Sequence, residues 1–327
     1  MKKEDLRIAF MGTPEFAVET LRALVENGYH VVAVVTQPDK PVGRHGSVLQ
    51  PSPVKQYAVA HGIPVLQPEK MKDPQFVEAL RAFEANLQVV VAFRMLPEVV
   101  WAMPQYGTFN VHASLLPQYR GAAPINWAVI NGETRTGVTT FFLDHEIDTG
   151  RIILQQPFDI PDTADVEYVY DGLMHLGASL CLRTLEVIIA ADGKPETTPQ
   201  SVHAADADSL RPAPKIFKET CQIQWQLPAK QVYDFIRGLS PYPGAWTMLV
   251  APDGKETVLK IFSTTKCSSP SHHAHEGSSI VVDRKHLYIA CSDGWLQINS
   301  LQLAGKKRMD AQAFINGVKD LENYSVK

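Results

Sequence analysis

Residues 6–36 read LRIAFMGTPEFAVETLRALVENGYHVVAVVT, and this stretch decides the fold of the first part of the chain. Residues 6–11 are mostly apolar, as in a buried strand, and the run stops at Gly12. Residues 15–27 carry apolar side chains at helical spacing, with Thr13 as the expected N-cap and Pro14 at the first helical position. Residues 30–36 form a second apolar run. A strand, a helix and a strand at this spacing predict a βαβ unit and therefore a parallel sheet.

The same alternation continues as far as residue 191. Apolar runs predict strands at 63–66, 87–92, 108–112, 136–143 and 151–158. Helical periodicity predicts helices at 54–61, 74–85 and 122–131, and either one long helix or a helix pair at 164–191. Neither a G-x-G-x-x-G pattern nor a P-loop is present, so nothing indicates a dinucleotide or P-loop nucleotide cofactor. We expect an α/β domain over residues 1–191, with a Rossmann-like, mostly parallel sheet and helices on both faces.

The last part of the chain has a different pattern. The helical periodicity ends at Asp192-Gly193, and the Pro- and Thr-containing sequence to residue 208 is typical of a linker. Short strands are predicted at 245–249, 257–263, 279–282, 286–290 and 295–303, with helices at 229–238 and 310–317. Asp-Gly turns stand at 253–254 and 293–294. We therefore expect a linker over 192–208 and a small OB-like β-barrel domain over 209–327.

The composition is that of an ordinary globular protein, with 45% of the 327 residues hydrophobic and 20% charged. No apolar run approaches the roughly 18 residues of a membrane span, and the N-terminus resembles neither a signal peptide nor a transit peptide. The four cysteines show no C-x-x-C pairing, and the histidines at 272, 273 and 275 lie in a Ser-rich stretch typical of a surface loop. We expect a cytoplasmic protein with free thiols, no metal site and no membrane partner.

Charge is distributed unevenly along the chain. The formal net charge is −4, but residues 209–327 hold 15 Lys and Arg against 10 Asp and Glu, so this part carries +5 and residues 1–208 carry −9. A basic C-terminal part on an acidic protein favours a polyanionic partner. The long loop at 37–53 also holds cations, including Lys40 and Arg44, which suits either an arm that touches phosphate or a solvated surface loop.

Residues 108–121, TFNVHASLLPQYRG, form the most informative polar stretch. Side chains alternate along the predicted strand, so Asn110 and His112 share a face near its carboxyl end, where open α/β sheets bind ligands. The acidic turn at 144–150 contains Asp148. Taken alone, a core histidine, a capping asparagine and a solvated acidic turn would explain the same residues.

The chemistry that these residues favour is direct acyl transfer. The sequence has no G-x-S-x-G motif and no Cys beside a His, and Ser114 stands in a sequence typical of a turn, so a covalent intermediate is not expected. The Asn110 amide and a protonated His112 can both donate to a developing oxyanion. A nearby carboxylate can orient the imidazole and accept the proton of an attacking amine.

The order of the motifs resembles the folate-dependent formyltransferases. The resemblance is carried by Asn110-x-His112-x-Ser114, by LLPQYRGAAP at 115–124, and by Leu143-x4-Asp148-Thr-Gly. It extends to FMGTPEF at 10–16, TQPDKPVGR at 36–44, PSPVK at 51–55, APKI at 213–216, PYPGAW at 241–246 and LAGKK at 303–307. These matches follow one another in order over nearly the whole chain. They are most similar to the members of the family that act on methionyl initiator tRNA.

The resemblance implies formyl transfer from 10-formyltetrahydrofolate to the amino group of methionyl initiator tRNA, with no metal and no obligate protein partner. It implies that the catalytic residues are Asn110, His112 and Asp148. The residues implied to bind the formyl donor lie in three loops: Phe93, Arg94, Met95, Leu96, Ser114, Leu115, Leu116, Pro117 and Asp144. Those implied to bind tRNA are cationic: Lys40, Arg44, Lys306, Lys307 and Arg308.

The chain departs from the family pattern at three places. Residues 93–95 are Phe-Arg-Met where the family commonly has Tyr-Gly and an apolar residue, residues 45–47 hold fewer cations than usual, and Asn86 stands where Asp is usual. Three alternatives stay open. They are a formyltransferase acting on a small amine, such as glycinamide ribonucleotide or an amino-sugar nucleotide; a non-catalytic tRNA- or folate-binding module; and, most weakly, a nucleotide-dependent dehydrogenase without the glycine fingerprint.

Overall fold

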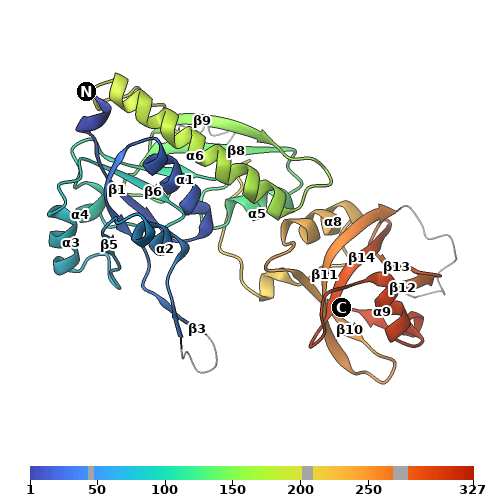
Figure 1. Ribbon diagram of the computed structural model, residues 1–327. Coiled ribbons are helices and arrows are strands. Elements are labelled where there is room, and N and C mark those ends of the chain that lie inside the picture. Colours follow the sequence, from blue (N-terminus) through green and yellow to red (C-terminus); the bar gives the residue numbers. More distant parts are fainter. Residues whose placement is uncertain (43–47, 201–208, 268–278) are drawn as a thin grey trace. The chain divides into compact units, whose positions relative to one another are not determined.

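The computed structural model describes residues 1–42, 48–200, 209–267 and 279–327, and it divides into two compact units (Figure 1). The first unit comprises Met1–Pro124, Thr136–Asp159 and Tyr170–Ala213. The second comprises Ile125–Arg135, Ile160–Val169 and Pro214–Lys327. Two early segments therefore pack with the C-terminal part of the chain. The division of the sequence into 1–191, 192–208 and 209–327 stays a prediction.

The first unit is built on a sheet whose strands span Arg7–Gly12 (β1), His30–Val35 (β2), Val65–Leu66 (β5), Leu87–Val91 (β6), Thr108–His112 (β7), Arg135–Phe142 (β8) and Ile152–Asp159 (β9). Their order is β5-β2-β1-β6-β7-β8-β9. The pairs from β5 to β7 are parallel, whereas β7 and β8 are antiparallel. The prediction of a mostly parallel α/β sheet is confirmed.

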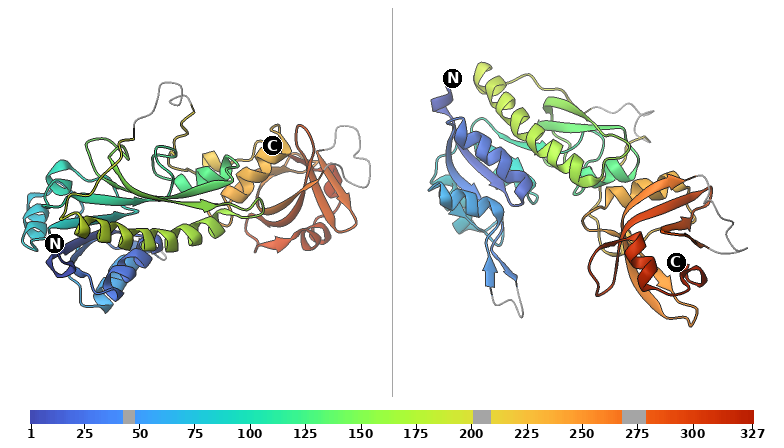
Figure 2. Two further views of the ribbon diagram at one scale, coloured as in Figure 1. Left: turned by 90° about the horizontal axis from the view of Figure 1, so that it is seen from above. Right: turned by 45° about the vertical axis from the view of Figure 1, so that its right-hand side comes forward.

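Helices cover both faces of this sheet, as predicted. They are α1 (Glu15–Glu26), α2 (Pro53–Ala60), α3 (Pro74–Arg81), α4 (Glu98–Trp101) and α6 (Val166–Ala190), with a 3-10 turn at Lys3–Asp5. On one face, Leu80 of α3 and Val100 of α4 pack in one apolar cluster with Met11 of β1. On the other face, Gly177 of α6 faces Val111 of β7, and α1 lies beside α6 (Figure 2).

Helix α6 is 25 residues long and, by length and composition alone, apolar enough to cross a membrane. A count of uninterrupted apolar residues overlooks it because Arg183 and Glu186 break the run. Within the described residues 44% of its most apolar 18-residue stretch is buried. The buried side chains of the helix include Leu173, Leu180 and Leu185. The core helix of a globular domain has this composition and burial, so the helix is weak support for a membrane span.

The predicted cap of α1 was wrong. The N-cap is Pro14, which has an extended backbone and no side-chain cap, rather than Thr13. The Thr13 hydroxyl oxygen instead lies 3.4 Å from both the Thr36 hydroxyl and the backbone nitrogen of Gln37. Thr13 therefore ties the first turn of the sheet to the end of β2.

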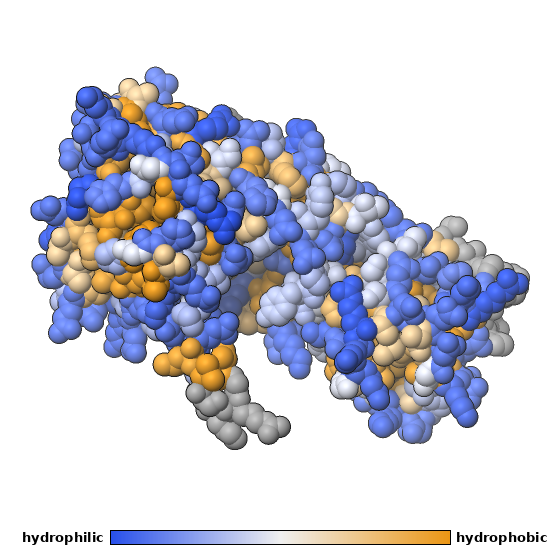
Figure 3. Space-filling view, viewed as in Figure 1, coloured by the Kyte–Doolittle hydropathy of each residue, from blue (hydrophilic) through white to orange (hydrophobic). Residues whose placement is uncertain are grey.

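Residues 37–53 were expected to form a loop without structure of its own, and this prediction was also wrong. The described part contains a hairpin in which β3 (Lys40–Val42) pairs with β4 (Val48–Gln50). Its apolar side chains are exposed, Val48 by 58% and Leu49 by 65%, and they gather on the surface in Figure 3. Because neither strand buries a face, no alternation of apolar and polar residues marked them in the sequence.

The second unit is a curled antiparallel sheet, which confirms the prediction of a small barrel-like domain (Figure 1). Its strands span Ala245–Val250 (β10), Glu256–Cys267 (β11), Ile280–Asp283 (β12), His286–Ala290 (β13), Trp295–Leu303 (β14), Met309–Asp310 (β15) and Ser325–Val326 (β16). The order is β12-β13-β14-β11-β10-β16, with β15 on β14. Register shifts between Ile261 and Thr264 allow the long β11 to bend.

Short helices pack with this sheet: most of α5 (Pro124–Ile130), α8 (Ala229–Gly238), α9 (Ala311–Gly317) and the 3-10 turns Glu219–Cys221 and Leu321–Asn323. The apolar core includes Ile236 of α8, Phe314 of α9 and Leu296 of β14.

Polar contacts hold the two early segments within the second unit. Trp127 of α5 donates its indole N–H to the carbonyl of Pro214 at 2.8 Å. Asp162 forms an ion pair with Lys266 at 2.6 Å. Arg237 of α8 is buried and donates to the carbonyl of residue 164 at 2.7 Å. These contacts join residues that lie between 73 and 104 positions apart in the sequence.

Candidate active site

The candidate active site lies where β6 and β7 end. Because these strands are parallel, their carboxyl ends meet at one edge of the sheet. The antiparallel β8 places Thr139 beside His112, the last residue of β7. Asn110 lies two residues before His112 and shares its face of the strand. The sheet therefore brings the two polar residues of the motif to the edge where the sequence predicted them.

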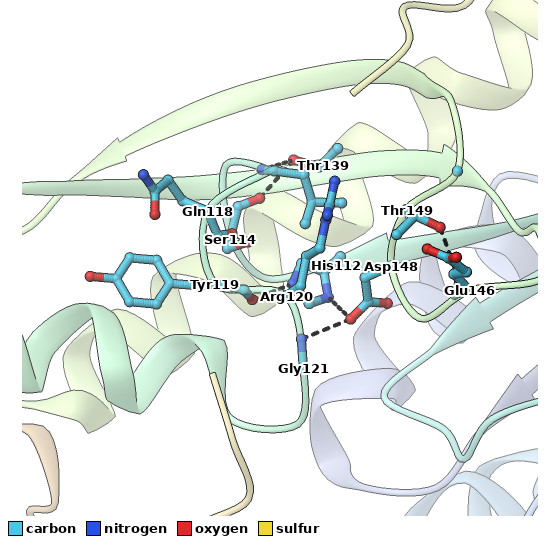
Figure 4. A network of polar contacts seen from close by, with 12 residues as sticks. His112, Ser114, Gln118, Tyr119, Arg120, Gly121, Thr139, Glu146, Asp148 and Thr149 are labelled. Atoms are coloured by element: carbon cyan, nitrogen blue, oxygen red, sulfur yellow. Dashed lines mark hydrogen bonds and ion pairs between the residues drawn. The ribbon is translucent and has the colours of Figure 1, made fainter. Parts of the chain in front are cut away.

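The two ring nitrogens of His112 face different partners (Figure 4). Nε2 lies 3.0 Å from the backbone carbonyl oxygen of Tyr119, and Nδ1 lies 3.8 Å from Oδ2 of Asp148. A carbonyl oxygen only accepts hydrogen bonds, so Nε2 carries a proton. A second proton on Nδ1 would produce an imidazolium that faces the carboxylate. Since only 6% of the His112 side chain is exposed, water screens this attraction weakly.

Asp148 is held in place by the loop that follows β7. Its Oδ2 accepts the backbone N–H of Gly121 at 2.9 Å, as drawn in Figure 4. Gly121 has a φ of +127°, and a Cβ at this position would lie 2.5 Å from the carbonyl oxygen of Ala213. Only glycine allows this approach, so the glycine of the motif has a structural reason.

Asn110 offers an unused hydrogen-bonding atom to the site. Its side-chain oxygen is buried and has no hydrogen-bond partner among the residues that the structure describes. An unpaired buried acceptor costs roughly 1–3 kcal/mol, which a bound substrate group can relieve. The amide therefore marks a position where a ligand atom is expected.

The loop at 114–117 is fixed to β8. Ser114 is fully buried, and its hydroxyl donates to a backbone carbonyl at 2.7 Å. Thr139 donates to the carbonyl of Ser114 at 2.7 Å and accepts the N–H of Leu116 at 3.1 Å. Leu115 lies close against Gly137 of β8, and the Leu116–Pro117 peptide is cis. The Ser114 hydroxyl thus shapes a turn, in keeping with the reading that it is not a nucleophile.

The loop at 93–96 follows β6 and combines buried with exposed side chains. Leu96 is buried in the sheet core, whereas Met95 is 73% exposed. Arg94 donates to the backbone carbonyls of residues 68 and 69 and lies 5.7 Å from the ring of Phe93. Burial lowers the pKa of the Arg94 guanidinium. Arg94, which departs from the family pattern, therefore braces this loop against the segment after β5.

The acidic turn lies beside this loop. Asp144 shapes the turn, because its Oδ1 accepts the Thr149 hydroxyl at 2.7 Å and a backbone N–H at 3.1 Å. His145 makes an edge-to-face contact with Trp101 of α4, with ring centroids 5.3 Å apart. Helix α4 directly follows the 93–96 loop. Ile147 of the turn is 60% exposed, so both loops present an apolar side chain at the surface.

The residues implied to bind tRNA belong to different units. Lys40 is exposed on β3 of the first unit, and Arg44 lies outside the described residues. Lys306, Lys307 and Arg308 are exposed together in the turn between β14 and β15 of the second unit. The guanidinium of Arg308 lies 4.4 Å from the ring of Phe262.

Gln200 is a residue of the site that sequence reasoning missed, because it falls in the expected linker. The segment before it docks on the start of β9, where Thr198 and Ile152 exchange two backbone hydrogen bonds of 2.8 Å. The Gln200 amide then donates to the backbone of the 148–150 turn. Its neighbours form neither a motif nor a periodic pattern, so no sequence signal announced this contact.

Two further sequence predictions concern the cysteines and the binding of metal ions. All four cysteines are free, as predicted, and burial raises the pKa of the Cys181 and Cys291 thiols, the latter to about 12. Within the described ranges no group of three or more His, Cys, Asp or Glu side chains could hold a metal ion. The histidines at 272, 273 and 275 lie outside those ranges.

Comparison with known proteins gives matches over almost the whole chain. The profile of the family described as "Formyl transferase" matches residues 6–185, and that of "Formyl transferase, C-terminal domain" matches residues 215–319. The methionyl-tRNA formyltransferase of Parabacteroides distasonis is 63% identical over 327 residues, which is 100% of both chains. That of Bacteroides fragilis is 59% identical over 100% of this chain and 99% of its own, and that of Porphyromonas gingivalis is 50% identical over 97% of both.

Solved structures share the fold at lower identity. WlaRD, a sugar 3N-formyl transferase, covers 92% of this chain and 99% of its own, with a TM-score of 0.62 at 17% identity. HypX from Aquifex aeolicus, in complex with tetrahydrofolic acid, gives a TM-score of 0.61 at 19% identity, over 95% of this chain and 47% of that longer one. With both family profiles and full-length relatives in agreement, this chain belongs to the formyl transferase family.

Proposed function

We propose that this chain transfers the formyl group of 10-formyltetrahydrofolate to the amino group of methionyl initiator tRNA, for translation initiation. The observation that carries the proposal is the group formed by Asn110, His112 and Asp148 at the carboxyl end of β7. This group stands in a chain that is similar over its full length to methionyl-tRNA formyltransferases.

The loops around this group suit a folate-derived formyl donor. The exposed Met95 and Ile147 offer apolar surface on which a flat heterocycle can pack. The unpaired oxygen of Asn110 offers a hydrogen-bond acceptor at the reacting centre. We place the donor against the loops at 93–96, 114–117 and 144–148, where it supplies an activated formyl carbon.

Asn110 and His112 stabilise the charge that develops on the formyl oxygen during attack by the amine. His112 donates through Nδ1, because Nε2 is already engaged by the carbonyl of Tyr119. Asn110 donates through its amide N–H while its unpaired oxygen accepts an N–H of the amine. Each donor of this kind is worth roughly 10²–10³ in rate.

Asp148 has two roles in this proposal. It stabilises the imidazolium of His112 from 3.8 Å, and it accepts, directly or through a water molecule, the proton that the amine loses as its bond to the formyl carbon forms. The bond from the formyl carbon to the donor nitrogen then breaks, and a proton passes to that nitrogen as tetrahydrofolate leaves. General base assistance of this kind contributes roughly 10²–10⁴ in rate. The route needs neither a metal nor a covalent bond to the protein.

The tRNA substrate is proposed to contact cations of both units: Lys40, Arg44, Lys306, Lys307 and Arg308. The net charge of +5 over residues 209–327 supports a polyanionic partner for the second unit. We further propose that the protein acts in the cytoplasm, with no membrane partner and no obligate protein partner.

The proposal is tested by following transfer of radiolabelled formyl groups from 10-formyltetrahydrofolate to three acceptors offered in parallel. These are methionyl initiator tRNA, glycinamide ribonucleotide and an amino-sugar nucleotide, each at two salt concentrations. We expect transfer to the tRNA alone, weakening steeply with salt because phosphate contacts release counterions. Transfer to a small amine alone would overturn the substrate, and no transfer to any acceptor would indicate a binding module without activity.

A further inference from the structure

The carboxamide of Gln200 uses its full hydrogen-bonding capacity between two loops of the site. Its Nε2 donates to the carbonyl of Asp148 at 3.0 Å and to that of Gly150 at 2.7 Å. Its Oε1 accepts from Nε and Nη2 of Arg120 at 3.2 and 2.9 Å. Carbonyls only accept and a guanidinium only donates, so the amide can make all four contacts in this orientation alone.

The backbone that Gln200 holds is one that needs support. Asp148 has a φ of +55°, in the left-handed region that non-glycine residues rarely occupy. Such a conformation persists only where surrounding contacts over-determine it. Gln200 supplies two of these contacts through the carbonyls on either side of Thr149, and Gly121 supplies a third through the carboxylate.

The partner of Gln200 on the other side is the loop that holds both ionisable groups of the site. Tyr119 binds Nε2 of His112 through its carbonyl, and Gly121 binds the carboxylate of Asp148 through its N–H. Arg120 lies between them and directs its side chain to Gln200. One amide therefore connects the turn that carries Asp148 to the loop that orients His112.

Gln200 is itself anchored. Thr198 pairs with Ile152 at the start of β9, and Arg151 donates to the hydroxyl of Thr197 at 2.7 Å. The residue that bridges the two loops is therefore fixed to the sheet from which the 144–150 turn emerges. A residue in a freely moving linker could not fix the distance between Asp148 and His112.

We infer that Gln200, through Arg120, is a positioning residue that fixes Asp148 at its distance from His112. The inference rests on the proposed function, because it assigns Gln200 to the proton handling of that same reaction. Gln200 does not need to touch either substrate. Its removal should reduce the rate of transfer while leaving substrate binding almost intact.

The kinetic test compares Gln200→Ala with Gln156→Ala, a matched control on β9 whose amide also accepts from an arginine, Arg183, at 3.0 Å. We expect Gln200→Ala to lower kcat for formyl transfer roughly tenfold or more with little change in either KM, because a displacement of about 1 Å at a reacting group can cost about 100-fold. Gln156→Ala should keep the wild-type kcat. A wild-type kcat in Gln200→Ala would overturn the inference.

A double-mutant cycle with Asp148→Asn separates positioning from a general loss of structure. If Gln200 acts through Asp148, Gln200→Ala should have little further effect on kcat in the Asp148→Asn background. Equal fold-losses in both backgrounds would show that Gln200 acts elsewhere and would refute the assignment.

A second readout does not depend on the reaction. Hydrogen exchange of the amides in residues 144–150 should become faster in Gln200→Ala and stay unchanged in Gln156→Ala. Unchanged protection in Gln200→Ala would contradict the inference even if activity fell. Failure of the wild-type chain to formylate methionyl-tRNA would instead refute the proposed function alone, and the exchange experiment would still decide the role of Gln200.

Discussion

At the scale of single residues, His112 owes its orientation to a backbone carbonyl and a carboxylate on opposite sides of its ring. The carbonyl of Tyr119 fixes a proton on Nε2, which leaves Nδ1 as the nitrogen for chemistry. Nδ1 lies 3.8 Å from Asp148, which is within ion-pair distance but too long for a hydrogen bond. A substrate group can therefore approach Nδ1.

Replacing His112 tests this arrangement directly. His112→Ala is expected to reduce formyl transfer roughly 100-fold or more, because it removes one donor to the developing oxyanion. The variant should remain folded, with little change in its thermal unfolding midpoint. Steady-state kinetics and thermal unfolding check the two statements, and near-normal turnover would remove His112 from the mechanism.

Gly121 gives a second prediction at the same scale. In Gly121→Ala the new Cβ would lie 2.5 Å from the carbonyl oxygen of Ala213 at a φ of +127°, so both clash and strain are expected to destabilise the loop. Gly62→Ala is the matched control, because its φ is +66° and no atom lies within 4 Å of the added Cβ. We expect the control to cost about 1 kcal/mol of unfolding free energy from left-handed strain alone.

Denaturant unfolding measures both variants. Gly121→Ala should lose clearly more stability than Gly62→Ala and should also lose formyl transfer. Equal losses of stability in the two variants would show that the close approach to Ala213 matters little.

At the scale of elements, much of the first unit could be predicted because its strands are buried apolar runs separated by amphipathic helices. Strands β1, β6 and β7 all show this pattern, and β7 also carries the polar pair that identified the site. The hairpin of β3 and β4 could not be predicted, since its side chains remain exposed and its pattern lacks a buried face. Gln200 could not be found either, because its role depends on contacts with residues about 50 and 80 positions away.

The segment at 160–169 allows a prediction on the pH dependence of stability. The hydrogen bond from Lys266 lowers the pKa of Asp162 below its ordinary value of 3.8, against the opposing effect of partial burial. A carboxylate whose pKa is depressed on folding contributes stability that is fully present above 3.8 and is lost as the pH falls through its folded-state pKa. Asp162→Asn should therefore lower the unfolding midpoint at pH 7.

This difference between wild type and Asp162→Asn should shrink as the pH falls below 3.8. Thermal unfolding of both proteins across that range measures it. A constant difference at every pH would mean that the charge of Asp162 does not contribute to the stability of the second unit.

At the scale of the whole molecule, the proposed binding of tRNA to surface cations can be tested by removing positive charge. Lys306→Gln with Lys307→Gln removes two exposed cations from the turn between β14 and β15. Each lost phosphate contact should reduce the steepness of the slope of log K against log salt by roughly 1. Lys194→Gln, an exposed position of the first unit, is the control.

Filter binding of methionyl initiator tRNA across a salt series checks this prediction, together with kcat at saturating tRNA. We expect weaker binding and a shallower salt dependence in the double variant with kcat nearly unchanged. An unchanged slope would exclude these lysines from the tRNA interface.

The second unit is assembled from three separate segments of the chain, and this has a consequence while the protein is being synthesised. Ile125–Arg135 and Ile160–Val169 pack with residues that start only at Pro214, so both segments leave the ribosome before their partners exist. At about 5–20 residues per second, synthesis of the roughly 110 residues from Pro214 to Lys327 takes roughly 6–22 s. During that interval Ile130 of α5, which contacts Gly238 and packs against the apolar core of the second unit, lacks these partners. Ile125–Arg135 and Ile160–Val169 are therefore expected to complete their packing only after the residues from Pro214 onward have been made.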